Sequence, residues 1–153
     1  LSYGIHAMEL VINEKNIQMQ VATLPEVHAI PLLMYQLFYN LVGNATKFTR
    51  EGVQHIITIS NEPVSATAAR ELYLDAGRSY TRIIIKDNGI GFKQEFATQI
   101  FAIFSRLNTR EQFEGTGIGL ALCRKIVTEH GGEIYAVGKD GEGAEFHIVL
   151  PLA

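Results

Sequence analysis

Three polar or glycine-containing blocks of the chain carry side chains that could bind a nucleotide. The first holds two amides and an ammonium, Asn40, Asn44 and Lys47, at spacing i, i+4 and i+7. Amide oxygens are hard, neutral ligands that suit Mg²⁺ beside phosphate groups, and a lysine can neutralise phosphate charge. The same residue types are also common on the solvated face of an ordinary helix, and that interpretation is favoured for this block taken alone.

The second block is the hexapeptide Asp87-Asn-Gly-Ile-Gly-Phe92, which follows three isoleucines. A carboxylate at the end of a strand can accept a hydrogen bond from the exocyclic amine of a base. Gly89 and Gly91 would let a flat base lie against the backbone, because glycine has no Cβ. An Asx-turn that only reverses the chain is an equally good interpretation of the hexapeptide alone.

The third block is Gly115-Thr-Gly-Ile-Gly-Leu120, placed before an apolar helical run. Gly115, Gly117 and Gly119 would leave the unpaired amides of the helix N-terminus facing a phosphate, and Thr116 could cap the helix or contact a phosphate oxygen. The spacing fits neither the P-loop nor the Rossmann fingerprint. The glycines could also serve as a hinge for a lid over the ligand, and the two roles are compatible.

Apolar periodicity places these blocks on interleaved helices and strands. It predicts a helix from Pro31 to about Arg50, with a core stripe beside the polar stripe. That core stripe consists of Met34, Leu37, Leu41, Ala45 and Phe48. Further helices are predicted over 3–14 and 117–130, short helical pieces over 66–74 and 92–104, and strands over 17–21, 53–60, 80–87, 133–138 and 145–150. The turn from Lys139 to Gly143 predicts a closing antiparallel hairpin, so we expect an α+β fold with a mixed sheet covered by helices on one face.

Composition limits the classes of function. The 153 residues fit one domain, and a net charge of -3 gives no general affinity for nucleic acid. No apolar stretch approaches the ~18 residues of a membrane span. The one cysteine, Cys123, excludes an internal disulfide and fits a reducing compartment, so we expect a cytoplasmic domain without nucleic-acid or membrane contact. We also expect Cys123 to be a buried apolar residue, and the chain to be a fragment of a longer protein.

Together the blocks resemble the catalytic ATP-binding domain of sensor histidine kinases, within the superfamily of gyrase, Hsp90, histidine kinases and MutL. The segment from Asn40 to Phe48 is similar to the N box, Asp87 to Phe92 to the G1 box, Phe101 to Arg106 to the F box, and Gly115 to Leu120 to the G2 box. The resemblance implies a Bergerat-type two-layer α/β sandwich, with about five mixed strands and three main helices on one face. Residues 16–153 would be this domain, and residues 1–15 the tail of a helical connection.

The resemblance also implies a role for each box. Asn44 would ligate Mg²⁺, with Asn40 assisting or contacting phosphate, and Lys47 would contact the phosphates. Phe48 would pack beside the adenine, and Asp87 would accept a hydrogen bond from the adenine amino group. Phe101 and Phe104 would anchor the lid. The other nucleotide-binding residues would be Gly89, Ile90, Gly91, Phe92, Arg106, Gly115, Thr116, Gly117, Gly119 and Leu120.

Asn40 bears on the reaction. Hydrolytic relatives carry a glutamate there as the general base, whereas an amide cannot take a proton at neutral pH. The resemblance therefore implies transfer of the γ-phosphate of Mg²⁺-ATP to a histidine on a helical dimerisation domain, with a response-regulator receiver domain downstream. Alternatives are a nucleotide-binding module without transfer activity, an ATP-hydrolysing clamp of the gyrase or Hsp90 type, and a serine kinase of the anti-sigma type.

The acceptor histidine is expected outside this chain. None of the five histidines is followed by the acidic residue that marks the family's acceptor. His55 and His147 fall on predicted strands and are expected to be structural, and His130 should contact the last-turn carbonyls of its helix. His28-Ala29 stands where relatives often have Gly-Asp, which weakens the expected cap of the helix that begins near Pro31. The five histidines are His6, His28, His55, His130 and His147.

Overall fold

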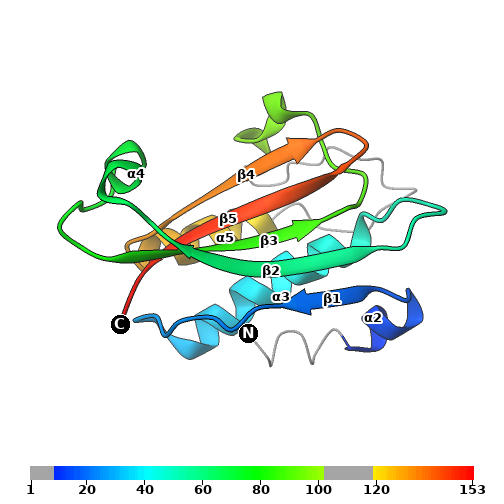
Figure 1. Cartoon of the computed structure of the whole chain (residues 1–153), viewed down its shortest axis with the longest axis horizontal. Helices are drawn as coiled ribbons and strands as arrows, with labels where there is room; N and C mark the ends of the chain where they lie inside the picture. Colours follow the sequence, from blue (N-terminus) through cyan, green and yellow to red (C-terminus); the bar gives the residue numbers. More distant parts are fainter. Residues whose placement is uncertain (1–8, 102–118) are drawn as a thin grey trace.

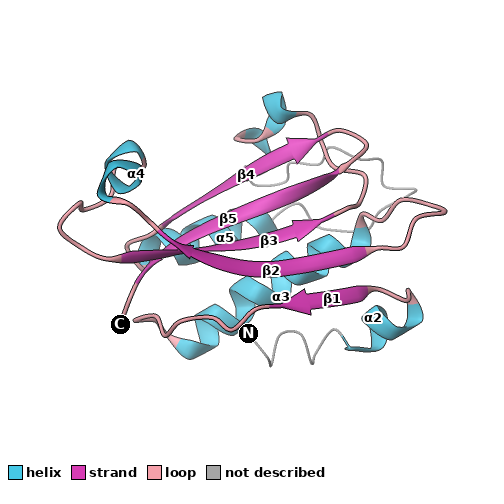
Figure 2. Cartoon of the chain, viewed as in Figure 1, coloured by secondary structure: helices cyan, strands magenta, loops and turns pink. Residues whose placement is uncertain are grey.

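One mixed sheet organises the chain, with its strands in the order β1-β2-β3-β5-β4. The computed structural model describes residues 9–101 and 119–153. β1 runs parallel to β2, and the other neighbours are antiparallel, as the closing hairpin required. The sheet predicted from the sequence is therefore confirmed (Figure 2). The strands are β1 (Gln18–Val21), β2 (Ile56–Pro63), β3 (Tyr80–Asp87), β4 (Glu133–Lys139) and β5 (Gly143–Pro151).

The long helices α3 and α5 lie together behind the sheet in Figure 1 and form the second layer. The short helix α2 adds Ile12 to the same core. The helices are α2 (Glu9–Glu14), α3 (Pro31–Lys47), α4 (Ala66–Glu71) and α5 (Gly119–Glu129), with 3₁₀ turns at Gln94–Phe96 and Gln99–Phe101. This arrangement confirms the expected α+β fold with helices covering one face.

Strand β3 shows how the sheet presents a polar group to the helical layer. Its side chains alternate between the two faces, and Ile83 and Ile85 enter the core beneath the helices. Asp87 continues the same row at the end of the strand and is only 7% exposed. A carboxylate thus occupies the last position of a buried apolar row.

Several boundaries differ from the predicted ones, and two of them border the connection between α3 and β2. Helix α3 ends at Lys47 rather than near Arg50, because Phe48 leaves the helical conformation at φ -102° and ψ 61°. β2 begins at Ile56 rather than Val53, because its pairing with β1 starts at Ile56 and its pairing with β3 starts at Ile57. Phe48 is consequently the cap residue of α3, and it is half-buried rather than part of the fully buried stripe.

Helix α4 packs on the other face of the sheet, which the sequence did not indicate. Its Ala69 contacts Tyr80 and Val149, which alternate with the core-facing residues of β3 and β5. Ser65 caps the helix by accepting a hydrogen bond from the Ala68 amide at 3.0 Å. The cluster of Ala69, Tyr80 and Val149 covers only one end of that face.

Candidate nucleotide site

The C-terminal end of α3 is capped by residues from elsewhere in the chain. The last carbonyls of a helix lack intrahelical partners. Here His55 Nε2 donates to Ala45 O at 2.7 Å, and Lys15 Nζ donates to Thr46 O at 2.8 Å. Just beyond the helix, the Ile90 amide donates to the carbonyl of Phe48 at 3.0 Å. These caps could not be predicted from the sequence, because each partner lies at least 10 residues away along the chain.

The contact at Phe48 brings the second block against the first. A Cβ on Gly89 would lie 1.8 Å from Phe48 O, so no other residue fits without moving the backbone. The carbonyl of Ile90 accepts from the Gly141 amide at 2.7 Å. The segment is therefore held between the end of α3 and the β4–β5 turn.

Gly91 depends on its lack of a side chain for two reasons. It has φ +65°, and a Cβ there would lie 2.2 Å from Lys139 O. The neighbouring Phe92 is half-buried against the main core, and its ring fills the space that a Cβ on Gly138 would need. The glycines of this block therefore serve close packing of the backbone as well as an open pocket wall.

The end of α3, the segment from Asp87 to Phe92 and the β4–β5 turn together form one corner of the protein. The carboxylate of Asp87 is the buried charged group of this corner. Its Oδ1 accepts from the Gly89 amide at 2.8 Å, which is the Asx-turn that the sequence allowed. Burial raises the pKa of this carboxyl from 3.8 to about 6, and hydrogen bonds from the Gly89 and Ala144 amides act in the opposite direction. A carboxylate held in this way can accept a hydrogen bond from an amine.

The polar stripe of α3 lies beside the core stripe, as predicted. Asn40 and Asn44 are half-buried, and Lys47 is exposed in the last turn. The side chain of Asn40 acts to lower the pKa of the Cys123 thiol on α5, so the stripe begins beside the contact between the two helices. Cys123 is buried, as expected, and burial raises its pKa to about 12.

The donor set fits a magnesium ion that arrives with a nucleotide. In residues 9–101 and 119–153, no three His, Cys, Asp or Glu side chains come together to hold a metal ion. Mg²⁺ commonly keeps several waters and binds through one or two protein oxygens plus substrate phosphates. The amide oxygens of Asn44 and Asn40 are of the right type for that arrangement.

Only the edges of the expected lid and of the third block fall within the described residues. Phe101 is 3% exposed, meets Phe146 edge-on at 6.1 Å, and lies 4.4 Å from the guanidinium carbon of Arg124. The sequence indicated Phe101 as an anchor, but it did not indicate Arg124. Gly119 begins the described part of α5, and Leu120 packs against the core. Phe104, Arg106, Gly115, Thr116 and Gly117 lie outside the described residues.

His130 joins the two long helices at their far ends. Its Nδ1 donates to Ile126 O at 2.7 Å, which confirms the predicted contact with a last-turn carbonyl. Its Nε2 accepts from the Ile30 amide at 3.1 Å and supplies the cap that α3 lacks in its own sequence. Together the two bonds require the neutral Nδ1–H tautomer.

Two further histidines, His55 and His147, make structural contacts, and one of them lies outside the strand predicted for it. His55 is buried, and it precedes β2 rather than lying within it. His147 lies on β5 as predicted, bonded to Glu145 at 3.0 Å and stacked on Tyr135 at 4.6 Å. Burial lowers the pKa of both imidazoles.

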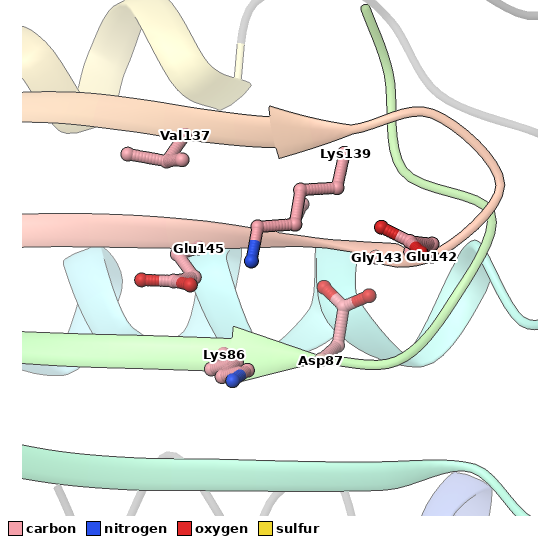
Figure 3. Close-up of a pocket in the computed structure, with 8 residues that line it drawn as sticks. Lys86, Asp87, Val137, Lys139, Glu142, Gly143 and Glu145 are labelled. Atoms are coloured by element: carbon pink, nitrogen blue, oxygen red, sulfur yellow. The ribbon is translucent and has the colours of Figure 1, made fainter. Parts of the chain in front are cut away.

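A small pocket opens on the opposite face at the same end of the sheet (Figure 3). Lys86, Glu145 and Val137 are in register across β3, β5 and β4 and share the face away from α3 and α5. Lys139 and Glu142 add one charge of each sign to its lining. Asp87 lines this pocket as well as the end of β3, and the lining carries three acidic and two basic side chains, so it does not favour an anion.

A family comparison agrees with this geometry. Residues 29–153 match the family described as histidine kinase-, DNA gyrase B-, and HSP90-like ATPase. The chain belongs to this ATPase family. The resemblance inferred from the N, G1, F and G2 boxes is thus confirmed.

Two curated relatives within the ATPase family are a phytochrome-like protein and a sensory kinase. The phytochrome-like protein Cph1 of Synechocystis is 33% identical over 92% of this chain and 17% of its own length. The adaptive-response sensory kinase SasA of a Synechococcus strain is also 33% identical, over 92% of this chain and 34% of its own. The chain therefore spans a third or less of these curated relatives.

Solved structures of histidine kinases share the fold. The catalytic domain of histidine kinase ThkA superposes with a TM-score of 0.73 and 28% identity, covering 98% of this chain and 90% of that one. Full-length ShkA in complex with AMPPNP gives a TM-score of 0.75 and 26% identity, covering 99% of this chain and 29% of that one. In the described part of this ATPase domain, no helix is both long and apolar enough to span a bilayer.

Proposed function

We propose that this chain is the catalytic domain of a two-component sensor histidine kinase. It binds Mg²⁺-ATP and donates the γ-phosphate to a histidine on a helical dimerisation domain. The observation that supports this most is the bond between Ile90 N and Phe48 O, at 3.0 Å. It joins the amide-bearing helix and the buried carboxylate of Asp87 in one corner, within a chain that the ATPase family covers from residue 29 to 153.

In this proposal, the residues of α3 and those of the segment after β3 have separate roles. Asn44 ligates Mg²⁺ with help from Asn40, and Lys47 neutralises phosphate charge from its exposed position in the last turn. Phe48 packs beside the adenine, and Asp87 accepts from the adenine amino group. The backbone and side chains that would complete the nucleotide site are Gly89, Ile90, Gly91, Phe92, Gly119 and Leu120, with Arg106, Gly115, Thr116 and Gly117 from the segment outside the description.

Transfer is proposed in preference to hydrolysis because of the group at position 40. Phosphoryl transfer depends mainly on positioning and charge neutralisation, so a donor domain needs no base of its own. The side chain of Asn40 is an amide, and it cannot take a proton from a water molecule at neutral pH. The attacking nucleophile is therefore expected from a partner.

The partners follow from the same proposal. A helical dimerisation domain supplies the acceptor histidine, and a response-regulator receiver domain takes the phosphoryl group afterwards. One solved neighbour, ThkA at 26% identity, has been described in complex with the response regulator TrrA. We place the domain in the cytoplasm, without contact to membrane or nucleic acid.

Calorimetric titration tests the nucleotide assignment. Asn44→Ala should sharply weaken Mg²⁺-dependent ATP binding, and Asp87→Ala should reduce the preference for ATP over GTP. Gln36→Ala, at an exposed position of the same helix, serves as the matched control. Unchanged affinity in the Asn44 variant would remove that residue from the metal site.

A transfer assay tests the reaction. The chain is mixed with a histidine-bearing dimerisation domain and ATP labelled at the γ-phosphate, and the label on the acceptor is measured. Labelled histidine is the expected result. Binding without labelling would indicate a nucleotide-binding module, and steady release of phosphate by the chain alone would indicate a hydrolysing clamp.

A further inference from the structure

Asn88 is the residue of the glycine segment with the most bonds to the rest of the protein. Its side-chain Oδ1 accepts from the Ile56 amide at 2.7 Å, and its Nδ2 donates to Gln54 O at 2.9 Å. The orientation of this carboxamide is defined, because its oxygen bonds to a donor and its nitrogen bonds to an acceptor. The backbone ladder between β2 and β3 ends at the pair Ile57 and Asp87, so the side chain of Asn88 continues the pairing where the backbone stops.

The backbone of Asn88 is held by the same loop. Arg50 Nε donates to its carbonyl at 2.9 Å, and two residues later the Ile90 amide bonds to Phe48 O at 3.0 Å. Every one of these contacts reaches the segment 48–56, which connects α3 to β2. The turn after β3 is thus docked on that connection over three successive residues.

His55 extends the link to the helix itself. It lies between the two residues that Asn88 bonds, it is 4% exposed, and its Nε2 donates to Ala45 O at 2.7 Å. Burial is the main cause that lowers the pKa of this imidazole, and Lys15 and Arg50 act in the same direction. A neutral ring keeps its role as a single donor to the helix.

The bond that orients Asp87 depends on this docking. Its Oδ1 accepts from the Gly89 amide at 2.8 Å, and Gly89 is the residue packed against Phe48 O. A shift of the turn would therefore move the carboxylate relative to α3. Asn40, Asn44 and Lys47, which are proposed to contact metal and phosphate, lie on α3 itself and would not move with the turn.

We propose that Asn88 is a positioning residue for base recognition, which locks the turn that aims Asp87 and couples it through His55 to the end of α3. This rests on the proposed function, because the base is the adenine of ATP. Loss of the carboxamide leaves the amide of Ile56 and the carbonyl of Gln54 without this partner. Discrimination between bases then falls, while binding of a base-free triphosphate does not.

The experiment compares Asn88→Ala with Asn61→Ala by calorimetry. Asn61 is a matched control, since its Nδ2 also donates to a backbone carbonyl, that of Thr23 at 2.8 Å, on a part of β2 away from the corner. The ligands are Mg²⁺-ATP, Mg²⁺-GTP and inorganic triphosphate with Mg²⁺. Asn88→Ala should lose roughly tenfold in ATP affinity, as expected when one hydrogen bond to a charged group is misplaced, with triphosphate affinity unchanged.

Hydrogen exchange gives a second readout. The amides of Ile56 and Gly89 should exchange faster in Asn88→Ala, while those in the middle of α3 should not. If Asn88→Ala fails to fold, Asn88→Ser decides, because its short hydroxyl removes the two-sided bridge with a smaller cavity.

The outcomes separate this proposal from the one on which it rests. An unchanged ratio of ATP to GTP affinity in a folded variant overturns the positioning role. Equal weakening of ATP and triphosphate also overturns it, because that indicates a general structural loss. Failure of the unsubstituted chain to bind any nucleotide would instead overturn the proposed function.

Discussion

The burial of Asp87 makes a quantitative prediction about stability. The carboxyl is 7% exposed, and burial raises its pKa from 3.8 to about 6. A folded-state pKa above the unfolded value means that the folded protein binds more protons between these limits. The stabilising contribution is therefore full below about pH 3.8 and is lost as the pH rises through 6.

The size follows from the shift. About two pKa units at ~1.4 kcal/mol each correspond to about 3 kcal/mol of unfolding free energy between pH 3.8 and pH 7.5. Asp87→Asn removes the ionisation, and its amide oxygen can still accept from Gly89. The difference in unfolding free energy between the two proteins should thus change by about 3 kcal/mol over this range, in favour of the variant at high pH.

Urea denaturation followed by circular dichroism at pH 4, 5, 6 and 7.5 measures this difference. Asp75→Asn is the matched control, since Asp75 Oδ1 accepts from the Gly77 amide at 2.9 Å in the same kind of turn but is exposed. Its difference from the unsubstituted protein should stay flat. A flat difference for Asp87→Asn as well would refute the argument that burial of this carboxylate destabilises the fold at neutral pH.

Three further substitutions or treatments test the described contacts. Gly89→Ala should destabilise the fold by about 1–3 kcal/mol in urea unfolding, because its Cβ would lie 1.8 Å from Phe48 O; a neutral effect would contradict this packing. His130→Ala should cost about 1–2 kcal/mol, since it removes the acceptor for the Ile30 amide, and unchanged unfolding would show that the cap contributes nothing. Cys123 should resist iodoacetamide at pH 8 in the native protein and react fully in urea, because burial raises its pKa to about 12; rapid labelling of the native protein would count against this burial.

The elements with strong periodicity could be predicted from the sequence. β3 was predicted from Tyr80 to Asp87 and is observed with those limits, because a run of isoleucines buried on one face has a distinctive pattern. The start of α3 at Pro31 follows from the preference of proline for the first turn. The sequence predicts the end of α3 near Arg50 instead of at Lys47, because Phe48 continues the apolar stripe although the chain has already left the helix.

The connections between the boxes could not be predicted. The types and order of the residues predict that Asn44 and Asp87 lie in one site. The hydrogen bonds that connect the turn after β3 to the end of α3, however, are made by Asn88 and His55. Each partner of these bonds is a backbone group, which every residue carries, so no residue type in the sequence marks it. The hydrogen bond from the Ile30 amide to His130 could not be predicted for the same reason, because it joins a backbone group to a side chain 100 residues away.

The end of α3 bears on the proposed metal site. A helix C-terminus carries a partial negative charge, which favours cations. Here Lys15 bonds to Thr46 O and Lys47 lies in the last turn, so two cations already occupy this environment. Under the proposed function, the amide oxygen of Asn44 would hold Mg²⁺ near this end of the helix, and the nucleotide phosphates would supply the formal negative charge. Under the proposed function, such a site would bind the metal together with the nucleotide, because the protein alone supplies only one or two neutral oxygen ligands.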